Sequence, residues 1–243
     1  MKVVVTIEAR MSATRLPGKV LFPIVGLPAL GFLISRLKQA SMIDEIVVAT
    51  TENPVDAPIE AWARTLGASV FRGSETDVMG RVLDAARLVK ADVVVELTAD
   101  NPLIDPKVID YAVKCFVSQD VDYVSNVTHR TYPLGMDTQV FSTRVLEDAY
   151  NRTQDPVHLE HVSLFIYRNP SIYRLSTFQA PDALRRPDLR LTMDTMEDYQ
   201  VIVKCAEACV QVHPNFGLED VIGFCDQNPE ITALNNEVIH KWV

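Results

Sequence analysis

The chain has 243 residues, 48% hydrophobic and 23% charged, a composition typical of a globular protein that buries a sizeable core. Its 32 acidic and 23 basic side chains give a net charge of −9, which argues against a nucleic acid or a membrane surface as partner, because both require a broad basic face. No apolar run approaches the roughly 20 residues that cross a bilayer. The four cysteines lack the spacing of a disulfide framework, so we expect a cytoplasmic protein with reduced thiols.

Apolar strand runs alternate with helical patterns along the first half of the chain. This alternation predicts an α/β fold, Rossmann-like, with a mostly parallel central sheet and helices on both faces. We expect strands at 3–7, 45–50, 69–72 and 93–97. We expect helices at 28–39, 54–66, 77–89 and 105–116.

The pattern becomes less regular after residue 121. We expect strands at 122–126, 138–141, 173–178 and 189–192, and helices at 143–150, 157–167, 196–212 and 218–227. The simplest division is a single domain with a core of about 1–121 and 189–212. A small inserted α+β lobe of about 122–188 faces a substrate, and a helical tail covers 213–243.

The first strand runs directly into a basic loop. After Glu8 the loop contains the cations Arg10, Arg15 and Lys19, the two hydroxyl residues Ser12 and Thr14, and no carboxylate. Backbone N–H groups converge in such loops, and cations add charge-assisted hydrogen bonds to an anion. Ligands of open α/β sheets bind beyond the carboxyl ends of the strands. The loop is therefore predicted to hold a polyphosphate.

Two aspartates follow buried-type strands in the same way. Asp100 comes after the strand at 93–97, and Asp194 comes after the strand at 189–192. A carboxylate near a phosphate-binding loop suits Mg²⁺, which takes one or two carboxylates together with phosphate oxygens and water. Each residue also fits a purely structural role, Asp100 in a turn and Asp194 at a helix start beside Thr195. Local sequence alone leaves both interpretations open.

Three further residues suggest a possible zinc site. Cys205, Cys209 and His213 recur every four residues on one predicted helix, which places them along one stripe. The apolar neighbours Val201 and Val210 favour a buried helix face with small cysteines instead.

Taken together, the motifs resemble one family over most of the chain. They are ARMSATRLPGK at 9–19, DEIVVATT at 44–51, FRGS at 71–74 with DV at 77–78, TADNPLID at 98–105, DYVSN at 122–126, TYPLGMD at 131–137, EHV at 160–162 and DTMED at 194–198. This series resembles the bacterial sugar-acid cytidylyltransferases, which include CMP-Kdo and CMP-sialic-acid synthetases. The spore-coat-polysaccharide SpsF-like branch is the most similar.

The resemblance implies a fold of the nucleotide-diphospho-sugar transferase type and a Mg²⁺-dependent reaction. An acceptor oxygen would attack the α-phosphate of CTP, giving a CMP-activated sugar acid or related glycan precursor and pyrophosphate. Arg10 and Lys19 are implied as catalytic, and Asp100 and Asp194 as metal ligands. The implied nucleotide-binding residues are Ala9, Arg10, Ser12, Thr14, Lys19, Arg72, Asp77 and Asp100. The implied partners are CTP and a small-molecule acceptor, and the implied assembly is a homodimer formed through the inserted lobe.

The acceptor is expected to bind in the inserted lobe. The candidate substrate-binding residues are Arg130, Tyr132, Asp137, Gln139 and His161, with His129 and His158 as further possibilities. His158 and His161 lie three residues apart, and such a pair on a helix is also compatible with a structural role. Two other functions stay open: transfer to a non-sugar acceptor such as an alcohol, phosphate or phosphonate, and a nucleotide-sugar binding module without turnover.

The chain departs from the family pattern at three positions. Ala13 stands where the family usually has glycine, and Met196 stands where it usually has proline. Met196 should still permit the helix to start, because proline there only pre-sets a backbone dihedral. Glu8 stands where the SpsF-like branch usually has glutamine, and the sequence does not assign it a role.

Overall fold

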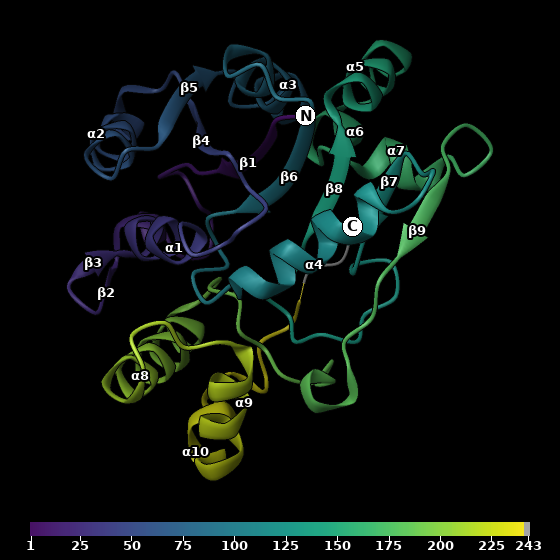
Figure 1. Cartoon of the computed structure of the whole chain (residues 1–243). Helices are drawn as coiled ribbons and strands as arrows, with labels where there is room; N and C mark the ends of the chain where they lie inside the picture. Colours follow the sequence, from purple (N-terminus) through teal and green to yellow (C-terminus); the bar gives the residue numbers. More distant parts are fainter. Residues whose placement is uncertain (241–243) are drawn as a thin grey trace.

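A computed structural model describes residues 1–240. Their fold is built around a central seven-stranded sheet (Figure 1). The strand order is β5-β4-β1-β6-β8-β7-β9. The strands are β1 (Val3–Glu8), β4 (Glu45–Thr51), β5 (Ser69–Gly73), β6 (Val93–Thr98), β7 (Tyr123–Ser125), β8 (Gln139–Ser142) and β9 (Leu175–Thr177). The first four run parallel, and β8 is antiparallel to its neighbours β6 and β7. The predicted fold class, a mostly parallel sheet with helices, is confirmed.

Helices cover both faces of the sheet (Figure 1). They are α1 (Ala29–Leu37), α2 (Ala57–Thr65), α3 (Val78–Leu88), α4 (Pro106–Val117), α5 (Thr143–Arg152), α6 (Pro156–Glu160), α7 (Leu164–Arg168), α8 (Met196–Val212), α9 (Leu218–Gln227) and α10 (Pro229–Thr232). Within residues 1–240, none of them is long and apolar enough to cross a membrane.

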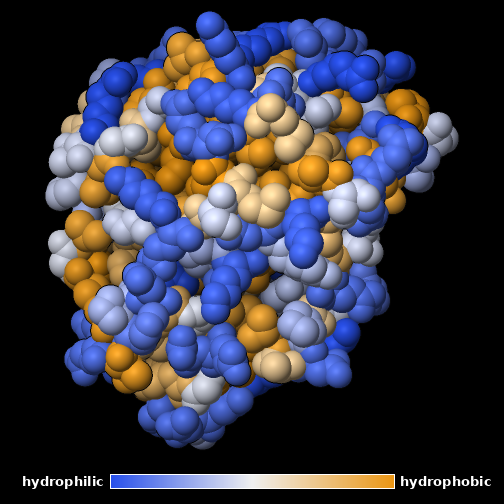
Figure 2. All heavy atoms as spheres, viewed as in Figure 1, coloured by the Kyte–Doolittle hydropathy of each residue, from blue (hydrophilic) through white to orange (hydrophobic). Residues whose placement is uncertain are grey.

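Successive residues of the central strands enter different cores, as the two-residue period of a strand requires. Val3, Val5 and Ile7 of β1 pack with α1, α2, α4, α8 and α9, whereas Val4 packs with α3 and α5. Both faces of β1 are therefore buried, which explains its nearly continuous apolar sequence. Figure 2 shows the outer surface from the same side: apolar side chains gather over its upper half and hydrophilic side chains surround them.

Short elements connect the core. A hairpin of β2 (Pro23–Ile24) and β3 (Leu27–Pro28) turns at Val25 and Gly26, which have φ of 47° and 79°. Single 3₁₀ turns form at η1 (Lys19–Leu21), η2 (Pro54–Asp56), η3 (Asp182–Leu184) and η4 (Ala233–Asn235).

Two element predictions are wrong. Residues 189–192 form no strand: a single parallel bridge joins Leu134 and Arg190, and Met193 N instead donates to Asp100 O at 2.8 Å. This contact turns the backbone toward the end of β6, so a ladder cannot continue. The single helix expected at 157–167 is two helices, α6 and α7, because His161 leaves the helical region with φ −114° and ψ 89°.

Gly135 allows two segments of the lobe and core to approach closely. Its φ is 104°, and a Cβ atom at this position would lie 2.5 Å from Leu191 O. Leu191 N donates to Leu134 O at 2.7 Å across the same contact. We therefore expect Gly135→Ala to lower the free energy of unfolding by about 3 kcal/mol, through strain and a broken backbone contact.

Chemical denaturation of the variant measures this effect. Gly223→Ala is the matched control, because nothing lies within 4 Å of the added Cβ inside α9. The control is expected to be neutral or more stable by about 0.5–1 kcal/mol. Equal stability of Gly135→Ala and the wild type would contradict the close approach.

Candidate active site

The loop after β1 is fixed at the carboxyl ends of two strands. Gly18 N donates to Met11 O at 2.9 Å, and Gly18 has φ of 73°, a conformation that favours glycine. Met11 N donates to Asp56 Oδ1 at 2.7 Å. Asp56 also accepts a hydrogen bond from Thr51 at the end of β4. These contacts give the loop a defined shape and place Lys19 next to the end of β1.

A cavity of about 450 Å³ opens beyond the ends of β1 and β6, and we call it the loop cavity. Its lining residues are Glu8, Ala9, Arg10, Ala13, Thr14, Arg15, Leu16, Lys19, Val20, Val78, Thr98, Asp100, Glu160, His161 and Asp194. The structure thus brings together the predicted phosphate-binding residues of the loop and both predicted metal ligands. His161, predicted for the acceptor, also lies in this cavity.

Lys19 joins three segments at the floor of the loop cavity. Its buried ammonium group contacts Asp100 Oδ1 at 2.7 Å and Asp194 Oδ1 at 3.0 Å. It also donates to Met193 O at 2.8 Å. An ammonium group has three N–H donors, so these contacts match its capacity. The lysine therefore holds the two carboxylates next to one another.

The two carboxylates differ in their electrostatic surroundings. Burial opposes the ionisation of Asp194, but Lys19, Arg15 and Arg190 outweigh it and lower its pKa. Arg15 and Arg190 contact Asp194 Oδ2 at 2.8 Å and 3.0 Å. Burial raises the pKa of Asp100, and Lys19 offsets this only in part. Asp194 is thus the more firmly ionised of the pair.

A second layer of contacts positions Asp194. Asp198, fully buried in the first turn of α8, accepts from Arg190 Nε at 2.7 Å and Arg190 Nη2 at 2.9 Å. Asp198 Oδ2 also accepts from the backbone N–H groups of Asp194 and Thr195. Thr195 caps the helix in return, forming a capping box. The helix therefore starts at Met196 without the proline usual in the family.

The C-terminal segment packs against this layer. Asn235 Nδ2 donates to Asp198 Oδ1 at 2.9 Å and to Arg190 O at 3.2 Å. Arg15 donates to Ile239 O at 3.4 Å, and Arg190 lies 3.3 Å from His240 Nδ1. Residues 235–240 therefore contact both arginines that hold Asp194. Sequence reasoning did not place the tail beside Asp194, because the tail has no periodic pattern.

Arg10 and Ser12 differ in whether their side chains are available to bind an anion. Arg10 lines the loop cavity, and its side chain makes no hydrogen bond or ion pair with other residues of the described chain, so it can receive an anion. Ser12 is exposed, donates to Glu75 Oε1 at 2.8 Å and is not part of the cavity lining. Its nucleotide contact stays a prediction.

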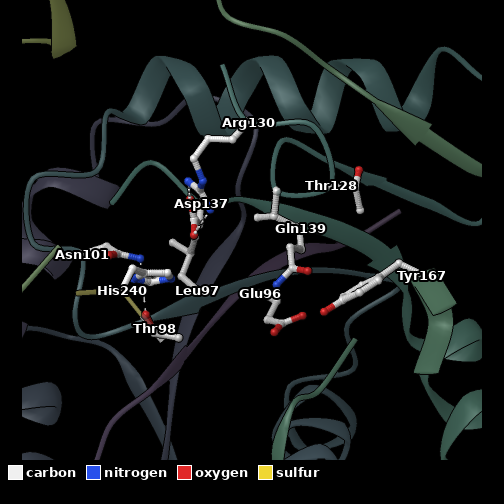
Figure 3. A pocket seen from close by; sticks show the side chains of 11 residues that line it. Glu96, Leu97, Thr98, Asn101, Thr128, Arg130, Asp137, Gln139, Tyr167 and His240 are labelled. Atoms are coloured by element: carbon white, nitrogen blue, oxygen red, sulfur yellow. Dashed lines mark hydrogen bonds and ion pairs between the residues drawn. The ribbon is translucent and has the colours of Figure 1, made fainter. Parts of the chain in front are cut away.

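A second cavity of about 370 Å³ adjoins the first, and we call it the lobe cavity (Figure 3). Its lining residues are Glu96, Leu97, Thr98, Asn101, Val127, Thr128, Arg130, Asp137, Gln139, Tyr167 and His240. Thr98 at the end of β6 lines both cavities. Arg130 and Asp137 form a paired contact at 2.5 Å and 3.0 Å across one end. The predicted acceptor residues Arg130, Asp137 and Gln139 thus share one cavity.

Other predicted residues lie elsewhere. Arg72 donates to Thr51 O at 2.9 Å and to Asn53 O at 2.8 Å, and Asp77 caps α3 while accepting from the Tyr150 hydroxyl at 2.7 Å. Arg72 and Asp77 line a third cavity of about 300 Å³, separate from Lys19. Both are engaged structurally, and their nucleotide contacts remain predictions.

Tyr132 and the cysteine stripe belong to the core. Tyr132 is 3% exposed and packs edge-on against Phe178, and it does not line the lobe cavity. Cys205 and Cys209 are buried, with the Cys205 sulfur 3.7 Å from that of Cys225. No group of three or more His, Cys, Asp or Glu side chains within residues 1–240 could hold a metal ion, which disfavours the zinc alternative.

Asp100 and Asp194 nevertheless fit Mg²⁺. One carboxylate oxygen of each residue contacts the same Lys19 ammonium group, so the two carboxylates lie close together. Both residues line the loop cavity. Mg²⁺ characteristically takes one or two carboxylates and completes its shell with substrate phosphates and water. A pair of hard oxygen ligands beside a polyphosphate-type loop therefore suits this ion.

Two carboxyl groups of the cavities, the partly buried Glu8 and the buried Glu96, received no role from the sequence. Glu8 lines the loop cavity, and Glu96 lines the lobe cavity on the neighbouring strand. Burial raises the pKa of Glu8 to about 7, with Arg81 opposing the shift and Asp100 adding to it. The sequence did contain a sign that Glu96 is functional, because it is the single carboxylate inside the apolar run at 93–97.

The mostly parallel sheet has a basic loop and paired carboxylates at the carboxyl ends of its strands. This arrangement is typical of α/β enzymes that act on nucleotides. The cytidylyltransferase family matches residues 4–234. The chain therefore belongs to the cytidylyltransferase family and is a CTP-dependent nucleotidyltransferase.

Individual relatives agree with this assignment. The spore coat polysaccharide biosynthesis protein SpsF of Bacillus subtilis is 35% identical over 230 residues, covering 92% of this chain and 94% of its own. A 3-deoxy-manno-octulosonate cytidylyltransferase of Geobacter metallireducens is 29% identical, covering 69% and 75%. A cytidylyltransferase structure from Leptospira borgpetersenii is 34% identical with a TM-score of 0.89, covering 99% of this chain and all of its own.

The raised pKa of Glu8 predicts a pH-dependent stability. A carboxyl whose folded pKa is raised stabilises the fold below its ordinary value of 4.5, and that contribution is lost as the pH rises through about 7. Glu8→Gln removes this loss. We expect the melting temperature of Glu8→Gln to exceed that of the wild type increasingly as the pH passes from below 4.5 to above 7.

Thermal unfolding over this pH series measures the difference, and Glu147→Gln at a partly exposed position of α5 is the control. Parallel pH profiles for Glu8→Gln and the wild type would show that Glu8 titrates normally.

Proposed function

We propose that the protein transfers CMP from CTP to an oxygen of a sugar acid or a related glycan precursor and releases pyrophosphate. The observation that carries this proposal is the meeting of two cavities at Thr98. One cavity contains a basic loop and two carboxylates suited to a nucleotide, and the other contains polar groups suited to an acceptor. SpsF is named for spore coat polysaccharide biosynthesis and the Geobacter enzyme for 3-deoxy-manno-octulosonate, which supports a sugar acid or a related glycan precursor as acceptor.

The residues of the loop cavity take the nucleotide roles. Arg10 binds the phosphates of CTP, and the positive charge of Lys19 beside them helps Arg10 stabilise negative charge on the departing pyrophosphate. Asp100 and Asp194 hold Mg²⁺, which supplies charge neutralisation of the phosphates when bound. Ala9 and Thr14 add contacts from the loop. Positioning and charge neutralisation suffice for such a transfer, so no covalent nucleophile is needed.

The residues of the lobe take the acceptor roles. Arg130, Asp137 and Gln139 lie in the lobe cavity, and His161 faces the neighbouring loop cavity. The division into a core and a substrate lobe at 122–188 is part of the same proposal. Family resemblance also supports a homodimer, and the four free cysteines support a cytoplasmic location.

Pyrophosphate release tests the function directly. The full chain is incubated with CTP, Mg²⁺ and a panel of acceptors: sugar acids, phosphosugars, alcohols and phosphonates. We expect release to require both Mg²⁺ and a sugar acid, and Asp100→Asn to abolish it without unfolding the protein, because one of two metal-binding carboxylates is lost.

Asp84→Asn is the matched control, since Asp84 is an exposed carboxylate of α3 paired with Arg87. Near-normal turnover of Asp100→Asn would contradict the metal role. Release with phosphonates alone would reassign the acceptor class, and nucleotide binding without release would indicate a binding module.

A further inference from the structure

Glu96 is a buried carboxyl without a structural explanation. It lies in β6 after Val93, Val94 and Val95, and only 7% of the residue is exposed. Its Oε2 atom is buried and has no hydrogen-bond partner among the described residues. An unpaired buried polar atom costs stability, and such atoms persist mainly where a ligand uses them. Since Glu96 lines the lobe cavity, a molecule that enters this cavity is placed to supply the missing partner.

The neighbours of Glu96 are held in fixed orientations. Gln139 Oε1 accepts from the Tyr123 hydroxyl at 2.5 Å and from the Ser163 hydroxyl at 2.7 Å. These two bonds determine which way the amide faces, so its NH₂ group is the part left to donate. In Figure 3 the phenol of Tyr167 and the carboxyl of Glu96 point toward one another. The result is a preorganised wall of hydrogen-bonding groups.

This end of the cavity suits an uncharged ligand group. Burial raises the pKa of Glu96 well above its usual range, and the charge of the nearby Glu8 adds to the shift, whereas the neighbouring polar side chains of Ser163 and Gln139 oppose it. The neutral carboxyl that results can donate one hydrogen bond and accept another. The permanent cation among the described lining residues is Arg130, which lies at the other end and contacts Asp137.

We propose that Glu96, with Gln139 and Tyr167, binds a neutral hydroxyl or acylamino group of the acceptor, so that the acceptor's carboxylate lies away from this wall. The inference rests on the proposed transfer to a sugar acid and specifies how that acid is oriented. Glu96 selects the acceptor and takes no part in binding CTP.

Binding without turnover tests the assignment. The full chain is saturated with CTP in EDTA and titrated calorimetrically with two probes, 3-deoxy-manno-octulosonate and N-acetylneuraminate. Glu96→Gln keeps a donor and an acceptor, so we expect its Kd for the tighter probe to stay within about threefold of the wild type. Glu96→Met keeps the volume but loses the polar group, so we expect weakening of at least about tenfold.

Glu147→Gln and Glu147→Met, on α5 outside both cavities, are matched controls for the two substitutions. CTP affinity and melting temperature are measured for every variant. If Glu96→Met does not fold, Tyr167→Phe replaces it, and a severalfold weaker Kd for the tighter probe is expected from the lost hydroxyl.

The results separate this inference from the proposed function. A wild type that binds a probe but releases no pyrophosphate with Mg²⁺ contradicts the transfer and leaves the Glu96 assignment standing. Three results would overturn the assignment: wild-type affinity in Glu96→Met or, in its place, Tyr167→Phe; equal losses in Glu96→Gln and Glu96→Met, which would indicate a charged group; or no binding of either probe by the wild type.

Discussion

The ammonium group of Lys19 ties together the loop after β1, the end of β6 and the start of α8. Its partners Asp100 and Asp194 are 81 and 175 positions away along the chain and lie 2.7 Å and 3.0 Å from it. A buried charge is tolerated only when its partners are complete, so these segments must assemble together. Because both carboxylates also face the loop cavity, the contact that fixes the fold locally also places the groups proposed for phosphate and metal binding.

Strand β6 connects this nucleotide side to the acceptor side. Glu96 and Thr98 are two residues apart and so point to the same face of the strand. Glu96 lines the lobe cavity, Thr98 lines both cavities, and Asp100 follows in the loop cavity. Along β6 and the loop that follows it, the group proposed for acceptor binding comes first, the residue shared by the two cavities second, and the proposed metal ligand third. The C-terminal segment adds a further constraint, since Asn235 and His240 contact Arg190, which holds Asp194.

The sequence predicted the elements whose signals are local. The strands before Arg10 and Asp100 are apolar runs of parallel type, and their carboxyl ends must share one edge of the sheet. The predicted strand at 189–192 failed because Met193 bonds to Asp100 O instead of extending a ladder. Arg72 has the charge that suits a phosphate, yet it donates to the backbone carbonyls of Thr51 and Asn53 at and just after the end of β4. The placement of His240 depends on tertiary packing, which no periodicity records. Glu96 carried a readable signal, a lone carboxylate within an apolar strand.

Lys19 is proposed to organise the nucleotide side of the reaction. The most direct test compares steady-state pyrophosphate release by the wild type and Lys19→Met, after confirming by melting temperature that the variant is folded. We expect kcat/KM for CTP to fall roughly 10²- to 10³-fold, the scale of losing one preorganised charge in the transition state. An unchanged kcat and an unchanged KM for CTP, with an altered KM for the acceptor alone, would contradict it.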